Sequence, residues 1–240
     1  MSMSAMIAGI LVGLSKAGLK GINVITVTLL ALTFGAKAST GIVLLLLIMG
    51  DTMAVLYYKR KCNWSLLFKL LPYVVIGVCV GAFLGQDMPE VIFKKVMAII
   101  IIFSAIMMII SEKYSYEVTD KSTLLSIILG LLTGITTMIG NLAGAFSNLF
   151  FLSMRLSKEA FIGTAAWLFF IINIFKIPFH VFMWETVHTN SLLTAIKILP
   201  FIALGFVIGL KTVALFSDKN YRYFIIVMTI VGAVVMLFKE

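Results

Sequence analysis

The sequence has few charged residues, and this scarcity excludes most classes of soluble protein. Charged residues occupy only 12% of the 240 positions, against 62% for hydrophobic residues, and the mean hydropathy is +1.14. A soluble domain of this size cannot cover its surface with so few polar side chains. The apolar runs are about 20 residues long and recur along the chain, which predicts membrane-spanning helices.

Cysteine and histidine are also scarce. Cys62 and Cys79 are too few and too isolated for a disulfide framework, and with two scattered histidines they make a poor metal site. No phosphate-binding loop motif and no segment long enough for a soluble domain occur, so we expect no cofactor, no metal and no ATP hydrolysis. Because no charge precedes Lys16, we expect no removable signal peptide. The net charge of +9 reports membrane orientation rather than nucleic-acid binding.

The sequence contains an internal repeat. The matched residues, in chain order, are Gly9 and Gly130, Gly13 and Gly134, Gly41 and Gly163, Asp51 and Asn173, Pro72 and Pro200, Gly77 and Gly205, and Gly81 and Gly209. The order of these pairs never changes, which predicts two homologous membrane repeats. We place them at 1–113 and 121–240, joined by a polar linker at 114–120.

Each repeat contains four apolar segments, and the first of each is too long for one crossing. The segments are 5–34, 38–58, 66–86 and 91–111, then 122–152, 158–182, 191–213 and 220–238. A straight helix of about 30 residues would run about 45 Å, against a hydrocarbon core of about 30 Å. Glycine and polar residues interrupt both long segments, at "SKAGLKG" (15–21) and "TTMIGNLAG" (136–144). We therefore predict a break at each of these two stretches.

The distribution of lysine and arginine separates two topologies. Fourteen cations remain when those well inside the apolar segments are left out, namely Lys16, Lys20, Lys69, Lys176 and Lys197. If all eight segments cross the membrane, the fourteen divide six against eight. If each long segment is a re-entrant hairpin, they divide ten against four. The ten are Lys59, Arg60, Lys61, Lys113, Lys121, Arg155, Lys158, Lys211, Lys219 and Arg222, and the four are Lys37, Lys94, Lys95 and Lys239. The positive-inside rule favours the hairpins, with the ten cations cytoplasmic and both termini extracytoplasmic.

In this topology each repeat has one re-entrant helical hairpin and three transmembrane helices. An odd number of full crossings inverts the second repeat relative to the first, which is typical of secondary transporters. We therefore predict an all-α polytopic protein of the cell membrane, built from two inverted repeats.

The first hairpin tip is the cationic half of the predicted binding site. Glycines allow the chain to reverse, and the half-helix that follows points its N-terminal amides into the protein, where they suit an anion. The candidate ligands at this tip are Ser15, Lys16, Gly18, Gly21 and Asn23. The alternative for Lys16 and Lys20 is that they extend to a membrane interface.

The second hairpin tip is polar but uncharged. Threonine and asparagine side chains supply donors there, and Gly140 and Gly144 are expected to supply the turn. One cationic tip and one neutral tip suit a small oxyanion. The candidate ligands on this side are Thr136, Thr137, Asn141, Gly144, Thr164, Asn173 and Lys176.

Asp51 and His180 are the candidates for coupling transport to protons. A carboxylate near the membrane centre is costly without a partner or water, so Asp51 either carries a proton or pairs with a lysine. The second repeat has Asn173 at the matched position, with Lys176 on the same helical face. His180 either relays a proton or has a structural role near a helix end.

The ordered set of motifs resembles the TauE/SafE sulfite-exporter-like permeases, also called the toluene-sulfonate uptake permease family. The resemblance is carried by "AGILVGLSKAGLKGINVITVTLLAL", by "LLPYVVIGVCVGAFLG" and by "FIGTAAWLFFIINIFKIPFHVF". It covers nearly the whole chain. Membership implies a transporter of small sulfur-containing or related organic anions, such as sulfite, thiosulfate, sulfoacetate or aryl sulfonates.

These observations together predict a secondary transporter rather than an enzyme. A small anion would sit between the two tips, and alternating access would be driven by the substrate gradient or by protons. The expected partners are this anion and the lipid bilayer, without nucleic acid. The alternatives are an anion channel without proton coupling and a carrier of a non-sulfur organic acid. A membrane enzyme or assembly factor would need a nucleophile–base set or a metal cluster, for which the chain has poor candidates.

Overall fold

The protein is all-helical in a computed structural model that describes residues 3–20, 22–114 and 123–237. Within these ranges there is no strand, which confirms the predicted all-α class. The helices are α1 (Met3–Lys16), α2 (Ile22–Phe34), α3 (Ala36–Tyr58), α4 (Trp64–Gln86), α5 (Glu90–Tyr114), α6 (Thr123–Gly140), α7 (Gly144–Ser153), α8 (Lys158–Pro178), the π-helical turn η1 (Phe179–Met183), α9 (Thr189–Ala214) and α10 (Asp218–Leu237). Gly21 and the predicted linker beyond Tyr114 lie outside the described residues.

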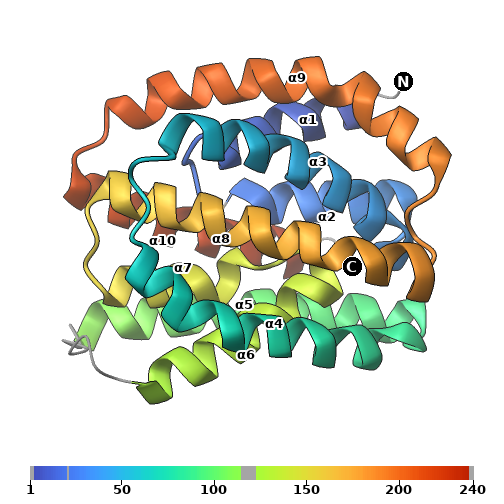
Figure 1. Cartoon of the computed structure of the whole chain (residues 1–240), viewed down its shortest axis with the longest axis horizontal. Coiled ribbons are helices and arrows are strands. Elements are labelled where there is room, and N and C mark those ends of the chain that lie inside the picture. The colour runs from blue at the N-terminus through green and yellow to red at the C-terminus, as the bar shows by residue number, and fades with distance from the viewer. Residues whose placement is uncertain (1–2, 21, 115–122, 238–240) are drawn as a thin grey trace.

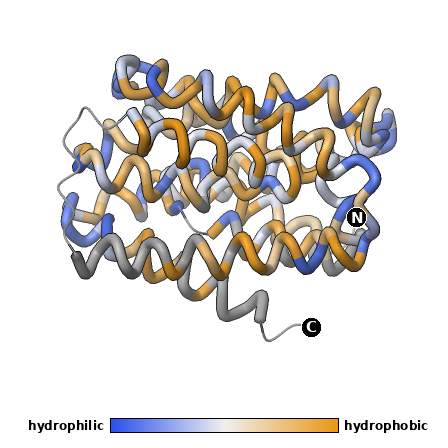
Figure 2. The backbone as a smooth tube through the Cα atoms, turned by 90° about the horizontal axis from the view of Figure 1, so that it is seen from below, coloured by the Kyte–Doolittle hydropathy of each residue, from blue (hydrophilic) through white to orange (hydrophobic). Residues whose placement is uncertain are grey.

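Five helical stretches in the described part of the chain are long and apolar enough to cross a membrane. They are Ala36–Tyr58, Trp64–Gln86, Thr123–Gly140, Lys158–Met183 and Thr189–Ala214. Large apolar side chains also face outward, among them Phe83 at 71% exposure and Val207 at 53%. Figure 2 shows apolar residues along the outer helices as well as inside. An apolar exterior over spans of this length is that of a multi-pass membrane protein.

Both long apolar segments are broken within the predicted stretches. The first break, which includes residues 17–20, separates α1 from α2, and the second break, residues 141–143, separates α6 from α7. Gly18 has φ 129°, which only glycine adopts easily. In the second break the left-handed residue is Asn141, with φ 55°, because asparagine tolerates this conformation better than most side chains. The expectation that Gly140 and Gly144 supply this turn is wrong.

After each break the chain folds back, so that α2 packs on α1 and α7 packs on α6. Figure 1 shows α2 returning beside α1 towards the end of the molecule at which α1 begins. α3 and α8 then cross each other inside the helical assembly. Since the polar residues Asp51, Asn173 and Lys176 lie on these two helices, their crossing positions the polar interior.

Helix crossings that depend on glycine join the two halves of the chain. α1 packs against α9, and α6 packs against α4. A Cβ atom at Gly13 would lie 2.1 Å from the carbonyl oxygen of Ile202, and one at Gly134 would lie 2.1 Å from that of Val74. These distances leave room only for glycine, and the close backbone approach is typical of small-residue contacts between membrane helices. Each broken segment therefore packs on a long helix of the other half.

Candidate functional site

A small polar cavity lies where the two helix breaks meet. Its volume is about 30 Å³, room for about two water molecules. The predicted ligands that line it are Ser15, Lys16, Asn23, Thr137, Asn141, Gly144 and Asn173. Side chains that sequence reasoning did not assign to the site also line it, namely Lys20, Leu47, Ala143, Asn148 and Phe169. The cavity thus brings together residues from both breaks and from α3 and α8.

Lys16 forms a buried ion pair with Asp51. The Lys16 Nζ atom lies 2.6 Å from Asp51 Oδ1, and the two side chains are 5% and 0% exposed. Asn173 Nδ2 donates a hydrogen bond of 2.8 Å to the other carboxylate oxygen. The crossing of α3 and α8 places Asp51 and Asn173 face to face. Lys16 therefore points into the protein rather than to a membrane interface, and Asp51 has a lysine partner.

Lys176 forms hydrogen bonds to residues at the second break. Its Nζ atom donates to the carbonyl oxygen of Thr137 at 2.7 Å and to Asn141 Oδ1 at 2.6 Å. Asn141 in turn donates to the carbonyl oxygen of Thr40 at 3.0 Å, and Asn23 donates to the Asn141 carbonyl oxygen at 3.1 Å. Backbone that leaves a helix inside a membrane protein must find such partners. A buried cation surrounded by neutral acceptors supplies them here.

Lys20 is the third buried lysine, and its contact is with an aromatic ring. Lys20 is 3% exposed, and its Nζ atom lies 5.1 Å from the centre of the Phe169 ring. The Nζ atom of Lys16 lies 5.0 Å from the centre of the same ring. A cation over an aromatic face is attracted by the ring quadrupole. Among the described residues no carboxylate forms an ion pair with Lys20. The feature of the sequence that could have placed Lys20 in the site is its position inside the glycine-rich break, four residues after Lys16.

Buried lysines outnumber buried carboxylates around the cavity. Three lysines are buried around it, and Asp51 is the one buried carboxylate in the described part of the chain. The N-terminal ends of α2 and α7 add positive partial charge, because their first amides have no partner within the helix. Such a site suits an anion and repels a cation. Among the described residues, no group of three His, Cys, Asp or Glu side chains that could hold a metal occurs.

Two tyrosines hold the backbone of the first break. Tyr58 of α3 donates its hydroxyl to the carbonyl oxygen of Ala17 at 2.8 Å, and Tyr221 of α10 donates to that of Gly18. The hydroxyl groups give these buried carbonyl oxygens a partner beyond the end of helix α1, and that of Gly18 also accepts from the backbone N–H of Lys20 at 2.7 Å. The tyrosines therefore set the position of the break that carries Lys20.

Three of the predicted residues have partners away from the cavity. Thr164 accepts a hydrogen bond of 2.8 Å from the backbone N–H of Asn63. It lies far from Asn173, because the nine helical residues between their positions span about 13 Å along the axis. Thr136 donates to the Thr133 carbonyl oxygen at 3.2 Å within α6. The Nδ1 atom of His180 lies 2.7 Å from Thr186 Oγ1, beyond the end of α8. Their side chains are engaged in local structure instead.

The comparisons with known proteins agree with the membrane fold and the resemblance seen in the sequence. The family model described as Sulfite exporter TauE/SafE matches residues 5–236. No curated protein and no solved structure matches the chain significantly. The family match spans nearly the whole chain and includes both helix breaks and both crossing helices. The chain therefore belongs to the TauE/SafE sulfite-exporter family of membrane transport proteins.

Proposed function

We propose that the protein is a secondary transporter of a small sulfur-containing or organic anion, such as sulfite, thiosulfate or a sulfonate. The observation that carries the proposal is the polar cavity between the two helix breaks, around which lysines outnumber carboxylates. Its three buried lysines exceed its one buried carboxylate, and an uncompensated buried charge is costly. An anion in the cavity relieves that cost.

The proposed substrate site combines Lys20, which has no carboxylate partner among the described residues, with neutral donors. Lys16 and Lys176 have oxygen partners at 2.6 Å each, whereas Lys20 contacts a ring and faces the cavity. Ser15 and Asn148 also line the cavity and offer a hydroxyl and an amide. We assign the charge of the bound anion to Lys20 and its remaining hydrogen bonds to these neutral groups.

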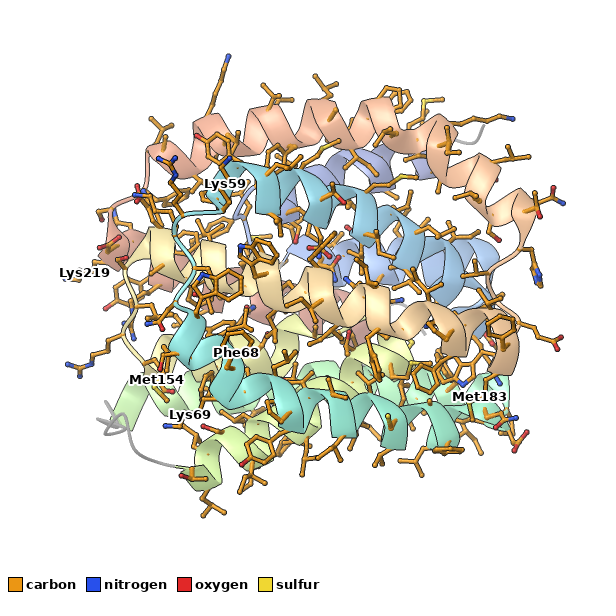
Figure 3. The ribbon with its side chains drawn as sticks, in the orientation of Figure 1. Lys59, Phe68, Lys69, Met154, Met183 and Lys219 are labelled. Carbon is orange, nitrogen blue, oxygen red and sulfur yellow. The ribbon has the colours of Figure 1, made fainter. Side chains whose placement is uncertain are left out.

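The inverted-repeat architecture is part of this proposal. It is supported by the matched glycine crossings at Gly13 and Gly134 and by the contact between the matched residues Asp51 and Asn173. It is also supported by the loop cations, because Lys59 and Lys219 lie towards the same end of the molecule, opposite Met183 (Figure 3). Two inverted repeats around a site at the midplane allow it to face each side in turn. The driving force would be the substrate gradient or protons.

Counterflow in proteoliposomes tests the transport proposal. Vesicles are loaded with unlabelled sulfite, thiosulfate, methanesulfonate or acetate, and entry of the labelled anion is followed. A carrier accelerates this exchange, and the sulfur anions should exchange faster than acetate. A channel would pass net flux without counterflow, and the absence of exchange for every anion would reject the carrier.

The lysine assignment is tested in the same vesicles. Lys20→Met should slow exchange at least about tenfold, which corresponds to about 1.4 kcal/mol of lost interaction. Lys197→Met, which removes an exposed lysine of α9, is the matched control and should exchange normally. Equal rates for Lys20→Met and the control would remove Lys20 from the substrate site.

A further inference from the structure

We propose that Asp51 is the resident counter-ion of Lys16, that the transported anion takes its place, and that Asp51 then takes up one proton. This inference rests on the proposed anion transport and specifies how that transport is coupled. It is carried by the arrangement of Lys16, Asp51 and Asn173 around the cavity.

Lys16 faces the cavity and the carboxylate at once. Lys16 and Asn173 are part of the cavity wall, while Asp51 lies behind them with a side-chain exposure of 0%. An anion that enters therefore meets the ammonium group of Lys16 from the open side. It competes with Asp51 for that group, since both are anions and the ion pair has no other cation at hydrogen-bond distance among the described residues.

A carboxylate deprived of its cation in this interior cannot remain charged cheaply. Asn173 still donates one hydrogen bond to it, but an amide does not replace a formal charge. Binding a proton removes the cost of the buried charge. The proton comes from water on the side from which the anion enters.

Among the described charged groups on the helices around Asp51, Lys16 is the one that forms an ion pair with it. Lys20 lies in the adjoining break, and Lys176 of α8 is held by Thr137 and Asn141. Helices α2 and α6, which pack on α3, contain no charged residue. The described charged side chains of α5 and α9 are exposed, namely Glu90, Lys94 and Lys95 on α5 and Lys197 and Lys211 on α9. On α3 itself, Tyr58 is bonded to Ala17.

The charges balance in this exchange. Before binding, the site holds the Lys16 ammonium and the Asp51 carboxylate. After binding, it holds the same ammonium, the anion and a neutral Asp51 carboxyl group. A monovalent anion therefore enters without changing the net charge of the site, and a divalent anion adds one negative charge. The repeat has an amide at the matched position, Asn173, so the pair supplies one proton site and not two.

Proton uptake on anion binding tests the proposal. The purified wild-type protein is titrated near neutral pH in weakly buffered detergent solution with thiosulfate and with methanesulfonate, and a dye reports pH. These are anions of strong acids and bring no proton themselves. Binding, measured by calorimetry, should be accompanied by uptake of about one proton per anion. Binding without uptake would show that the ion pair stays intact and would overturn the inference.

Three variants locate the proton. Asp51→Asn should bind the anion and lose the uptake, whereas Glu185→Gln, which removes an exposed carboxylate, should keep it. Lys16→Gln should bind more weakly and lose the uptake, because Asp51 is already without its cation. Uptake that persists in a folded Asp51→Asn protein would assign the proton elsewhere. If that variant does not fold, the wild-type titration decides alone. A wild-type protein that binds no anion would reject the proposed function itself.

Discussion

The three buried lysines have the same charge but different partners. Lys16 faces a carboxylate, Lys176 faces a carbonyl and an amide oxygen, and Lys20 faces a phenylalanine ring and the cavity. A cation held by neutral oxygens stabilises the backbone around it, while a cation without an oxygen partner is available to a ligand. At the residue scale, the three lysines therefore differ in role because their partners differ, although their side chains are the same.

Replacing Lys176 should cost stability. Lys176→Met leaves the side-chain oxygen of Asn141 buried without its donor, which costs about 1–3 kcal/mol. It also removes one of two hydrogen bonds to the Thr137 carbonyl oxygen, which still accepts from the backbone N–H of Asn141 at 3.0 Å. Lys20→Met removes no side-chain hydrogen bond seen among the described residues and is the matched comparison. Thermal unfolding in detergent should show a lowered melting temperature for Lys176→Met only. Equal melting temperatures would mean that Lys176 does not hold the second break.

At the element scale, the decisive features are the breaks in α1–α2 and α6–α7 and the crossings that hold them. The breaks were predictable because a run of that length cannot span a bilayer as one straight helix. The residue that makes the second turn was not, because Asn141 and its neighbouring glycines all tolerate a positive φ. Its side chain also bonds to Lys176 and to α3. Those tertiary contacts select Asn141.

Two glycines of the α4–α6 crossing should respond differently to a methyl group. A Cβ atom at Gly134 would meet only backbone atoms, the nearest at 2.1 Å, so Gly134→Ala must push the helices apart. At Gly81 the nearest atoms are 3.0 Å away, one of them the Cβ of Met138, so the crossing adjusts more easily. We expect Gly134→Ala to lose about 1–3 kcal/mol by overpacking and Gly81→Ala to lose clearly less. Thermal unfolding measures both, and the reverse order would contradict the crossing geometry.

At the scale of the whole molecule, the two repeats are proposed to lie in opposite orientations in the membrane. The proposal requires that the α2–α3 turn and the α7–α8 loop lie on opposite sides, since each follows a returning hairpin. Ala38 and Ser157 are exposed positions at these two places. Their accessibility therefore separates hairpins from straight crossings.

Single-cysteine labelling measures this orientation. Ala38→Cys should react with an impermeant maleimide from outside the cell, and Ser157→Cys should react only after the membrane is opened. The unmodified protein is the control, and its Cys62 should react slowly because burial raises the pKa of that thiol to about 11. Labelling of both introduced cysteines from the same side would reject the inverted topology.

The sequence by itself determined the membrane class, the helical fold, both breaks and most of the polar residues that line the cavity. It did so because hydropathy and length act locally along the chain, and a polar residue in an apolar run is conspicuous. Only the tertiary structure decided that Lys16 pairs with Asp51, that Lys176 holds the second break, that Lys20 faces the cavity and that Thr164 lies elsewhere. Those outcomes depend on how α3 and α8 cross and on where the returning chain ends. Helical period places a residue on a face, but the packing of other helices decides what it meets there.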